Sequence, residues 1–105
     1  MNNDLKKRLK DLQDKKFFEE LVISRGIEKE FFRVNQEAQI SMKPHPKSLG
    51  SALTNKFITT DFAEAQLELV TPVYNKIDDL FDFLSGLHEF VASNIDEDEI
   101  LWPFS

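Results

Sequence analysis

The chain has 105 residues, of which 41% are hydrophobic and 30% charged, and this length suits one domain with a single core. A formal net charge of -6 repels phosphate backbones, so nucleic acid is not an expected partner. The sequence holds no cysteine, which excludes disulfides and thiolate chemistry within it, and no apolar run or signal-peptide core, so we expect a cytoplasmic protein without a membrane partner.

The N-terminal region is expected to be helical. Leu5, Leu9 and Leu12 recur at the spacing of one helix face, which predicts an amphipathic helix over residues 3–14. Asn3 or Asp4 could cap this helix. A second short helical piece is expected over residues 17–21.

Residues 27–34 are predicted to form a strand, because aromatic and β-branched side chains are frequent there and fit no helix stripe. Two prolines and a glycine then mark residues 41–50 as a loop. A short helical turn is compatible with residues 51–56.

Residues 59–70 form the second strand candidate. Their side chains alternate, with Glu64, Gln66 and Glu68 on a polar face and small or aliphatic residues on the other. A helix remains a competing interpretation, since Ala, Glu, Gln and Leu favour helices. The Thr-Pro dipeptide at 71–72 ends the element in either case.

A long amphipathic helix is predicted over residues 77–95, with Asn75 as its N-cap. The acidic run at 96–99 should end it, because negative charge is unfavourable at a helix C-terminus. The final LWPFS is assigned no element. The order of helices and strands predicts an α+β fold with antiparallel strands flanked by helices.

Two acidic groups could bind a hard cation. Glu28 and Glu30 lie two residues apart, so on a strand they point the same way, about 7 Å apart. Such a pair suits Mg²⁺ or Mn²⁺, which prefer oxygen ligands, but it also suits a solvated strand edge. Asp61, Glu64 and Glu68 form a second set with the same two interpretations. Spacing alone does not bring the two sets together.

The sequence suggests no catalytic side chain. His45, between two prolines, is expected to be exposed in its loop, and His88 is expected to be a buried residue of the last helix. A phosphate-binding glycine loop and a G-x-S-x-G nucleophile motif are both absent from the sequence.

Three blocks resemble a known family. GIEKEFFRVN (26–35), GSALTNKFITTDFAEAQLELVTP (50–72) and the terminal LWPFS are similar, in order and spacing, to blocks of bacterial-type glutamate–cysteine ligase, also called γ-glutamylcysteine synthetase. The resemblance covers nearly the whole chain and is weakest over residues 1–24. It implies a fold similar to that of glutamine synthetase, whose strands carry carboxylates into a funnel-shaped site.

The resemblance also implies an activity. Members phosphorylate the γ-carboxylate of L-glutamate with ATP, and the amine of L-cysteine then attacks the γ-glutamyl phosphate, in the first step of glutathione synthesis. Carried over by position, it makes four carboxylates ligands of Mg²⁺ or Mn²⁺ and places one aromatic residue at the cysteine side chain. These are Glu28, Glu30, Asp61 and Glu68 for the metal, and Phe62 for the substrate.

The length of the chain limits this expectation. Family members are several times longer, with further metal ligands and nucleotide contacts after the LWPFS block. Residues 1–105 are therefore expected to be the N-terminal part of one larger catalytic domain, inactive and inclined to self-associate when alone. The alternative is a stand-alone acidic interaction module without catalysis, which would have no reason to keep the long middle block.

Overall fold

The fold is α+β, as the sequence predicts. The computed structural model describes residues 2–61 and 63–104, so Phe62 lies outside the described residues. The elements are α1 (Asn3–Asp14), α2 (Phe17–Glu20), β1 (Glu28–Val34), the 3₁₀ helix η1 (Lys47–Leu49), β2 (Ile58–Thr60), β3 (Gln66–Val70), α3 (Ile77–Asn94) and β4 (Ile100–Trp102).

The strands form one antiparallel sheet in the order β2-β3-β1-β4. β1 is therefore an inner strand, paired with β3 on one side and with β4 on the other. The sequence predicted two strands, and β4 was missed. Three residues beside a proline carry too short a pattern to predict a strand, and their pairing depends on β1, about 70 positions earlier.

The predicted single strand over residues 59–70 is wrong. The chain turns back between Asp61 and Gln66, so β2 and β3 form a hairpin in which Thr59 faces Glu68. Two backbone bonds close the turn: Asp61 N–H donates to the Gln66 carbonyl at 3.1 Å, and Gln66 N–H donates to the Ala63 carbonyl at 2.9 Å. No glycine or proline marks this turn, so it could not be predicted from local sequence.

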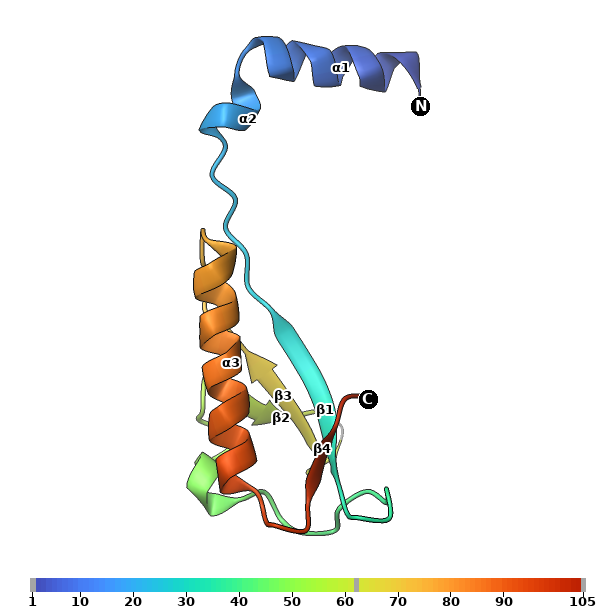
Figure 1. Ribbon diagram of the computed structural model, residues 1–105, viewed down its shortest axis with the longest axis vertical. Helices are drawn as coiled ribbons and strands as arrows, with labels where there is room; N and C mark the ends of the chain where they lie inside the picture. Colours follow the sequence, from blue (N-terminus) through green and yellow to red (C-terminus); the bar gives the residue numbers. More distant parts are fainter. Residues whose placement is uncertain (1, 62, 105) are drawn as a thin grey trace.

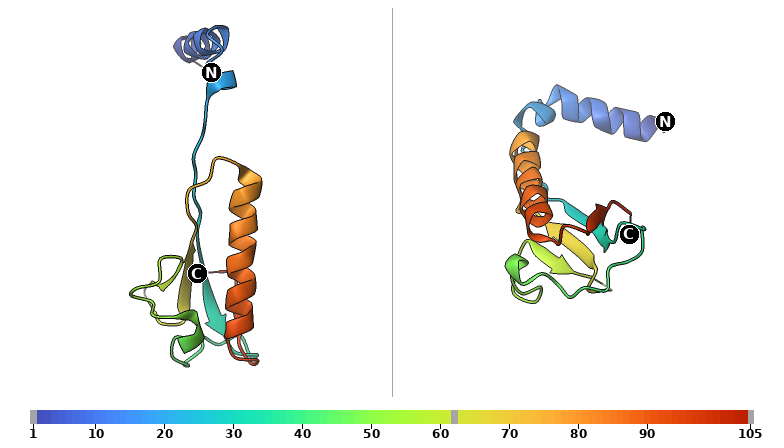
Figure 2. Two further views of the ribbon diagram at one scale, coloured as in Figure 1. Left: turned by 90° about the vertical axis from the view of Figure 1, so that its left-hand side faces the viewer. Right: turned by 60° about the horizontal axis from the view of Figure 1, so that its bottom comes forward.

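The hydrophobic core lies between one face of the sheet and α3. Phe31 of β1, Leu67 and Leu69 of β3, and Ile58 of β2 are buried with Leu84 and Val91 of α3. Figure 2 shows α3 lying along one side of the sheet. The opposite face carries the alternate residues of the same strands, and it is there that the acidic side chains lie.

The last helix begins without the predicted cap. α3 starts at Ile77, and its N-cap residue Lys76 makes no side-chain capping bond. Asn75 instead accepts a hydrogen bond from the Ser24 hydroxyl at 2.6 Å, which ties the chain before β1 to the start of α3. α1 is capped by Asn2, whose side chain accepts from Asp4 N–H, rather than by Asn3 or Asp4.

The two histidines are both half-buried. The expectation of an exposed His45 is wrong, because Glu64 binds the His45 backbone N–H and Arg33 binds the Lys43 carbonyl, which hold the proline-flanked loop against the hairpin turn and β1. His88 of α3 lies against the Phe31 ring, with Nε2 2.9 Å from Lys29 Nζ. Burial, and then the Lys29 charge, lower the pKa of His88. His88 is thus a packed residue of the helix–sheet interface, as the sequence suggested.

A buried ion pair fixes the end of the sheet. Arg33 of β1 is fully buried, and its guanidinium lies 2.5 Å from the Glu99 carboxylate, which is itself buried. Arg33 also donates to the backbone carbonyls of Lys43 and Glu64, at 2.9 and 3.3 Å. One side chain therefore joins β1, the proline loop, the hairpin turn and the segment that leads into β4.

The N-terminal helices project away from this body (Figure 1). The radius of gyration is 19.6 Å, against about 13 Å for a compact domain of this length. Among the described residues, the hydrogen bonds of residues 2–22 stay within the arm. Neither this arm nor α3 is long and apolar enough to cross a membrane.

Candidate metal site

The ladder between β1 and β3 places two acidic residues opposite each other. Glu30 pairs directly with Glu68 in the antiparallel register, so their side chains project from the same face. That face is the one away from α3, because Phe31, Leu67 and Leu69 fill the other. Like charges at directly opposed positions destabilise a sheet, so packing does not explain why two glutamates face each other here.

The hairpin brings in a third carboxylate. Asp61 and Glu68 would lie on opposite faces of one continuous strand. Because the chain reverses after Thr60, Asp61 continues the face of Thr59, which is the face of Glu68. Carboxylate oxygens of Glu30, Asp61 and Glu68 all lie within 4.8 Å of one another. The two acidic sets of the sequence therefore converge.

The fourth predicted ligand lies beside this trio. Glu28 stands two residues before Glu30 on β1, and it is outside the cluster of three. It is nevertheless close enough for its charge to act on the Glu68 carboxyl. The pKa of Glu68 is raised, first by burial and then by the charges of Glu28 and Asp61.

The carboxylates of the cluster raise one another's pKa. The pKa of Glu30 is raised, mainly because it shares a hydrogen bond with Asp61, which needs a proton between the two carboxyls. Partial burial and the charges of Asp61, Glu68 and Glu28 act in the same direction. Carboxylates held this close require a proton or a cation between them.

The donor set fits a small divalent cation. Mg²⁺ binds oxygens at about 2.0–2.1 Å, so opposite ligands of an octahedral site lie about 4.2 Å apart. Adjacent ligands of such a site lie about 3.0 Å apart. The three carboxylates, which lie within 4.8 Å of one another, would therefore have to move closer by side-chain rotation to share one Mg²⁺. The trio is made of carboxylate oxygens alone, and such ligands suit Mg²⁺, Mn²⁺ or Ca²⁺.

The blocks that carry this cluster match a known family. A model of the family described as glutamate-cysteine ligase matches residues 7–105. The chain belongs to the glutamate–cysteine ligase family. The match spans nearly the whole chain, including most of α1.

Individual relatives agree with the family match. The glutamate–cysteine ligases of Sodalis glossinidius and Edwardsiella ictaluri are each 52% identical to the chain over 83 residues, which is 79% of the chain. Those 83 residues are 16% of each relative, so the matched region spans about a sixth of the length of these ligases.

Solved structures support the fold. The glutamate–cysteine ligase of Francisella tularensis, determined in complex with AMP, superposes with a TM-score of 0.73 and 41% identity over 74% of the chain and 16% of that protein. A bifunctional glutathione synthetase from Pasteurella multocida gives a TM-score of 0.73 and 44% identity over 76% of the chain and 11% of that protein.

One acidic position named from the sequence lies apart from the cluster in this ligase family member. Glu64 belonged to the second acidic set, yet it lies outside the cluster and its Oε1 accepts the backbone N–H of His45 at 2.8 Å. It therefore joins the hairpin turn to the proline loop. Phe62, the expected contact to the cysteine side chain, is outside the described residues, so its role stays a prediction.

One polar residue of this face was not among the predicted site residues. Gln66 of β3 is 5% exposed, and its Nε2 donates to Glu30 Oε2 at 3.4 Å. The alternation of residues 64–68 had already placed it beside the carboxylates. A neutral carboxamide between two carboxylates on the same predicted face was the sequence feature that could have identified Gln66.

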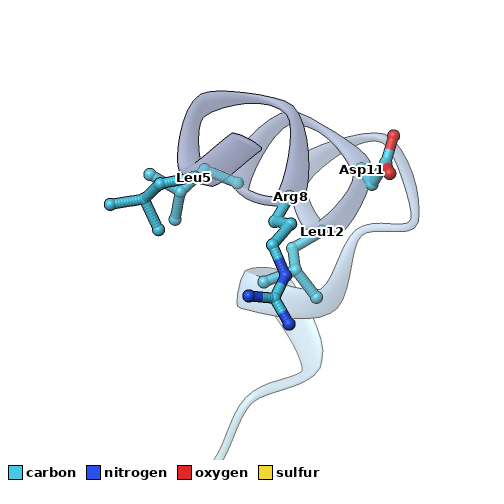
Figure 3. A pocket seen from close by; sticks show the side chains of 5 residues that line it. Leu5, Arg8, Asp11 and Leu12 are labelled. Atoms are coloured by element: carbon cyan, nitrogen blue, oxygen red, sulfur yellow. The ribbon is translucent and has the colours of Figure 1, made fainter. Parts of the chain in front are cut away.

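An apolar hollow lies elsewhere, on the arm of this ligase family member. It is open to the surface and lined by Leu5, Leu9 and Leu12 with Arg8 and Asp11, all from α1. Figure 3 shows Arg8 and Asp11 directed to different sides of the helix. This hollow holds none of the cluster carboxylates, which lie on the sheet.

Proposed function

We propose that this chain supplies the metal-binding strands of an ATP-dependent ligase that joins the γ-carboxylate of glutamate to the amine of cysteine. Residues 1–105 would form the N-terminal part of a larger catalytic domain. The observation that carries the proposal is the convergence of Glu30, Asp61 and Glu68 to within 4.8 Å on blocks shared with the family.

The residues of this chain hold charge in a fixed place. Glu30 and Glu68 stand on paired strands whose other face is locked to α3 by the core. Asp61 is held by its backbone bond to Gln66, and its turn is held by Arg33 and by the contact of Glu64 with His45. A cluster on such rigid elements keeps its geometry while substrates bind and leave.

The cation held by this cluster would be Mg²⁺ or Mn²⁺, with ATP as co-substrate. Such a cation neutralises phosphate oxygens during phosphoryl transfer, a reaction that depends mainly on positioning and charge. Glu28, whose charge raises the pKa of Glu68, is placed to extend the ligand set. The γ-carboxylate of glutamate would be activated as γ-glutamyl phosphate, which the cysteine amine then attacks.

A chimera tests the proposal. Residues 26–105 replace the matching segment of the Sodalis glossinidius ligase, and ADP release is measured with glutamate, cysteine, ATP and Mg²⁺. We expect turnover in the chimera and none in the 105-residue chain alone, since a glycine loop that could bind nucleotide is absent from its sequence. Turnover by the purified chain alone would contradict the proposed division of roles.

Substitutions in the chimera test each ligand. Glu30→Gln, Asp61→Asn, Glu68→Gln and Glu28→Gln should each lower kcat/KM by orders of magnitude, because each removes a charge while keeping its shape. Glu64→Gln is the matched control and should lose far less, because a carboxamide oxygen can still accept from His45 N–H. Near-normal activity of Glu30→Gln at limiting Mg²⁺ would refute the ligand assignment.

A further inference from the structure

The carboxamide of Gln66 lies inside the acidic face. In the ladder Glu30 faces Glu68 and Phe32 faces Gln66, so Gln66 is the diagonal neighbour of Glu30 on the same face. Its Nε2 lies 3.4 Å from Glu30 Oε2. Gln66 is 5% exposed, which restricts the carboxamide to this environment.

The same residue also holds the third ligand. The Gln66 backbone carbonyl accepts the Asp61 N–H at 3.1 Å, and its own N–H closes the hairpin turn on Ala63. Gln66 thus contacts Glu30 through its side chain and Asp61 through its backbone, and it stands two residues before Glu68 on β3. Gln66 therefore contacts, or shares a strand with, each of the three residues of the cluster.

A neutral donor suits this position. A lysine or arginine would hold Glu30 as well, but its charge would compete with a divalent cation for the carboxylates. An apolar side chain would leave the Glu30 carboxylate free to rotate. A carboxamide fixes one carboxylate oxygen and adds no charge, which is how outer partners of metal ligands commonly act.

We propose that Gln66 is a positioning residue that orients the Glu30 carboxylate for the divalent cation. The inference rests on the proposed metal site. Gln66 does not itself ligate the cation: its N–H group faces Glu30, and its effect is exerted through that carboxylate.

The test compares two methionine substitutions in the 105-residue chain. Gln66→Met keeps the length and burial of the side chain but removes the donor, and Gln13→Met makes the same change on the exposed surface of α1. The probe is Mn²⁺, and its free concentration is followed by electron paramagnetic resonance. Melting is followed by circular dichroism in parallel, and Gln66→Leu serves as a second variant.

We expect Gln66→Met to bind Mn²⁺ roughly tenfold more weakly than wild type. Its melting temperature should be unchanged, and Gln13→Met should behave as wild type. Mn²⁺ affinity within about twofold of wild type in folded Gln66→Met would overturn the inference and leave the metal site standing. An unresponsive wild type would overturn both. If both Gln66 variants melt far below wild type, Gln66 is a structural residue and the inference is overturned.

Discussion

At the scale of single residues, the carboxylates of Glu30 and Glu68 set a pH dependence of stability. Both pKa values are raised in the folded chain, so the folded state binds protons more tightly than the unfolded state. The stabilising contribution is complete below the ordinary glutamate pKa of 4.5 and is lost as pH rises through the raised values. Without metal, the cluster therefore destabilises the folded chain at neutral pH.

Replacing one carboxylate should reduce this repulsion and stabilise the folded chain at neutral pH. We expect Glu30→Gln without metal to melt a few degrees above wild type at pH 7 and together with it near pH 4, where the wild-type carboxyl is protonated. Mg²⁺ should raise the melting temperature of wild type more than that of the variant. The measurement is a set of thermal melts across pH with and without Mg²⁺, and a lower melting temperature for Glu30→Gln at pH 7 would contradict the argument.

Arg33 and Glu99 attract each other, unlike the carboxylates of the cluster, because each buried charge is compensated by the other. Arg33→Met leaves Glu99 buried without its cation and should cost about 3–5 kcal/mol of unfolding free energy in urea. The double change Arg33→Met with Glu99→Met should recover much of that loss, since replacing both partners by apolar groups is often tolerated. A double variant as unstable as the single one would indicate that the Arg33 bonds to the carbonyls of Lys43 and Glu64 dominate.

At the scale of elements, protection from hydrogen exchange should follow the sheet order rather than the order along the chain. The amides of β1 and β3 lie on inner strands and are paired on both sides, so they should exchange slowly, as should those of α3 that face the core. The amides of α1 and α2 should exchange fast, because no hydrogen bond ties this arm to the sheet among the described residues. Slow exchange in α1 in the monomer would show that the arm folds back onto the body.

At the scale of the whole molecule, exposed apolar side chains lie on the arm and along the outer strand of the sheet. Phe17 and Phe18 of α2 are 44% and 48% exposed, and Trp102 on β4 is 43% exposed. β4 is also an edge strand, with backbone groups free to pair with another chain. We expect the chain to self-associate as its concentration rises.

Sedimentation velocity at several concentrations checks this expectation. Trp102→Lys should weaken association, because a charged side chain on an edge strand opposes strand addition. Glu37→Lys makes a charge change on an exposed turn outside the strands and should have little effect. A wild-type chain that stays monomeric at all concentrations would contradict the role assigned to these surfaces.

The sequence determined the elements whose signal is local. The apolar stripes of α1 and α3 and the β-rich run of β1 predicted these three elements to within one or two residues, because periodicity within one segment reports its own buried face. The family blocks likewise determined the family, and they carried the four carboxylates and Phe62 as candidates before any geometry was known.

Tertiary structure decided what depends on pairing between distant segments. Strand β4, the hairpin between β2 and β3, and the buried contact of Arg33 with Glu99 exist only because β1 and β3 offer partners far along the chain. The turn after Asp61 has no glycine or proline to mark it, and helix-favouring residues surround it. That turn moved Asp61 to the face of Glu68, and so the convergence of the two acidic sets came from the fold and not from their spacing.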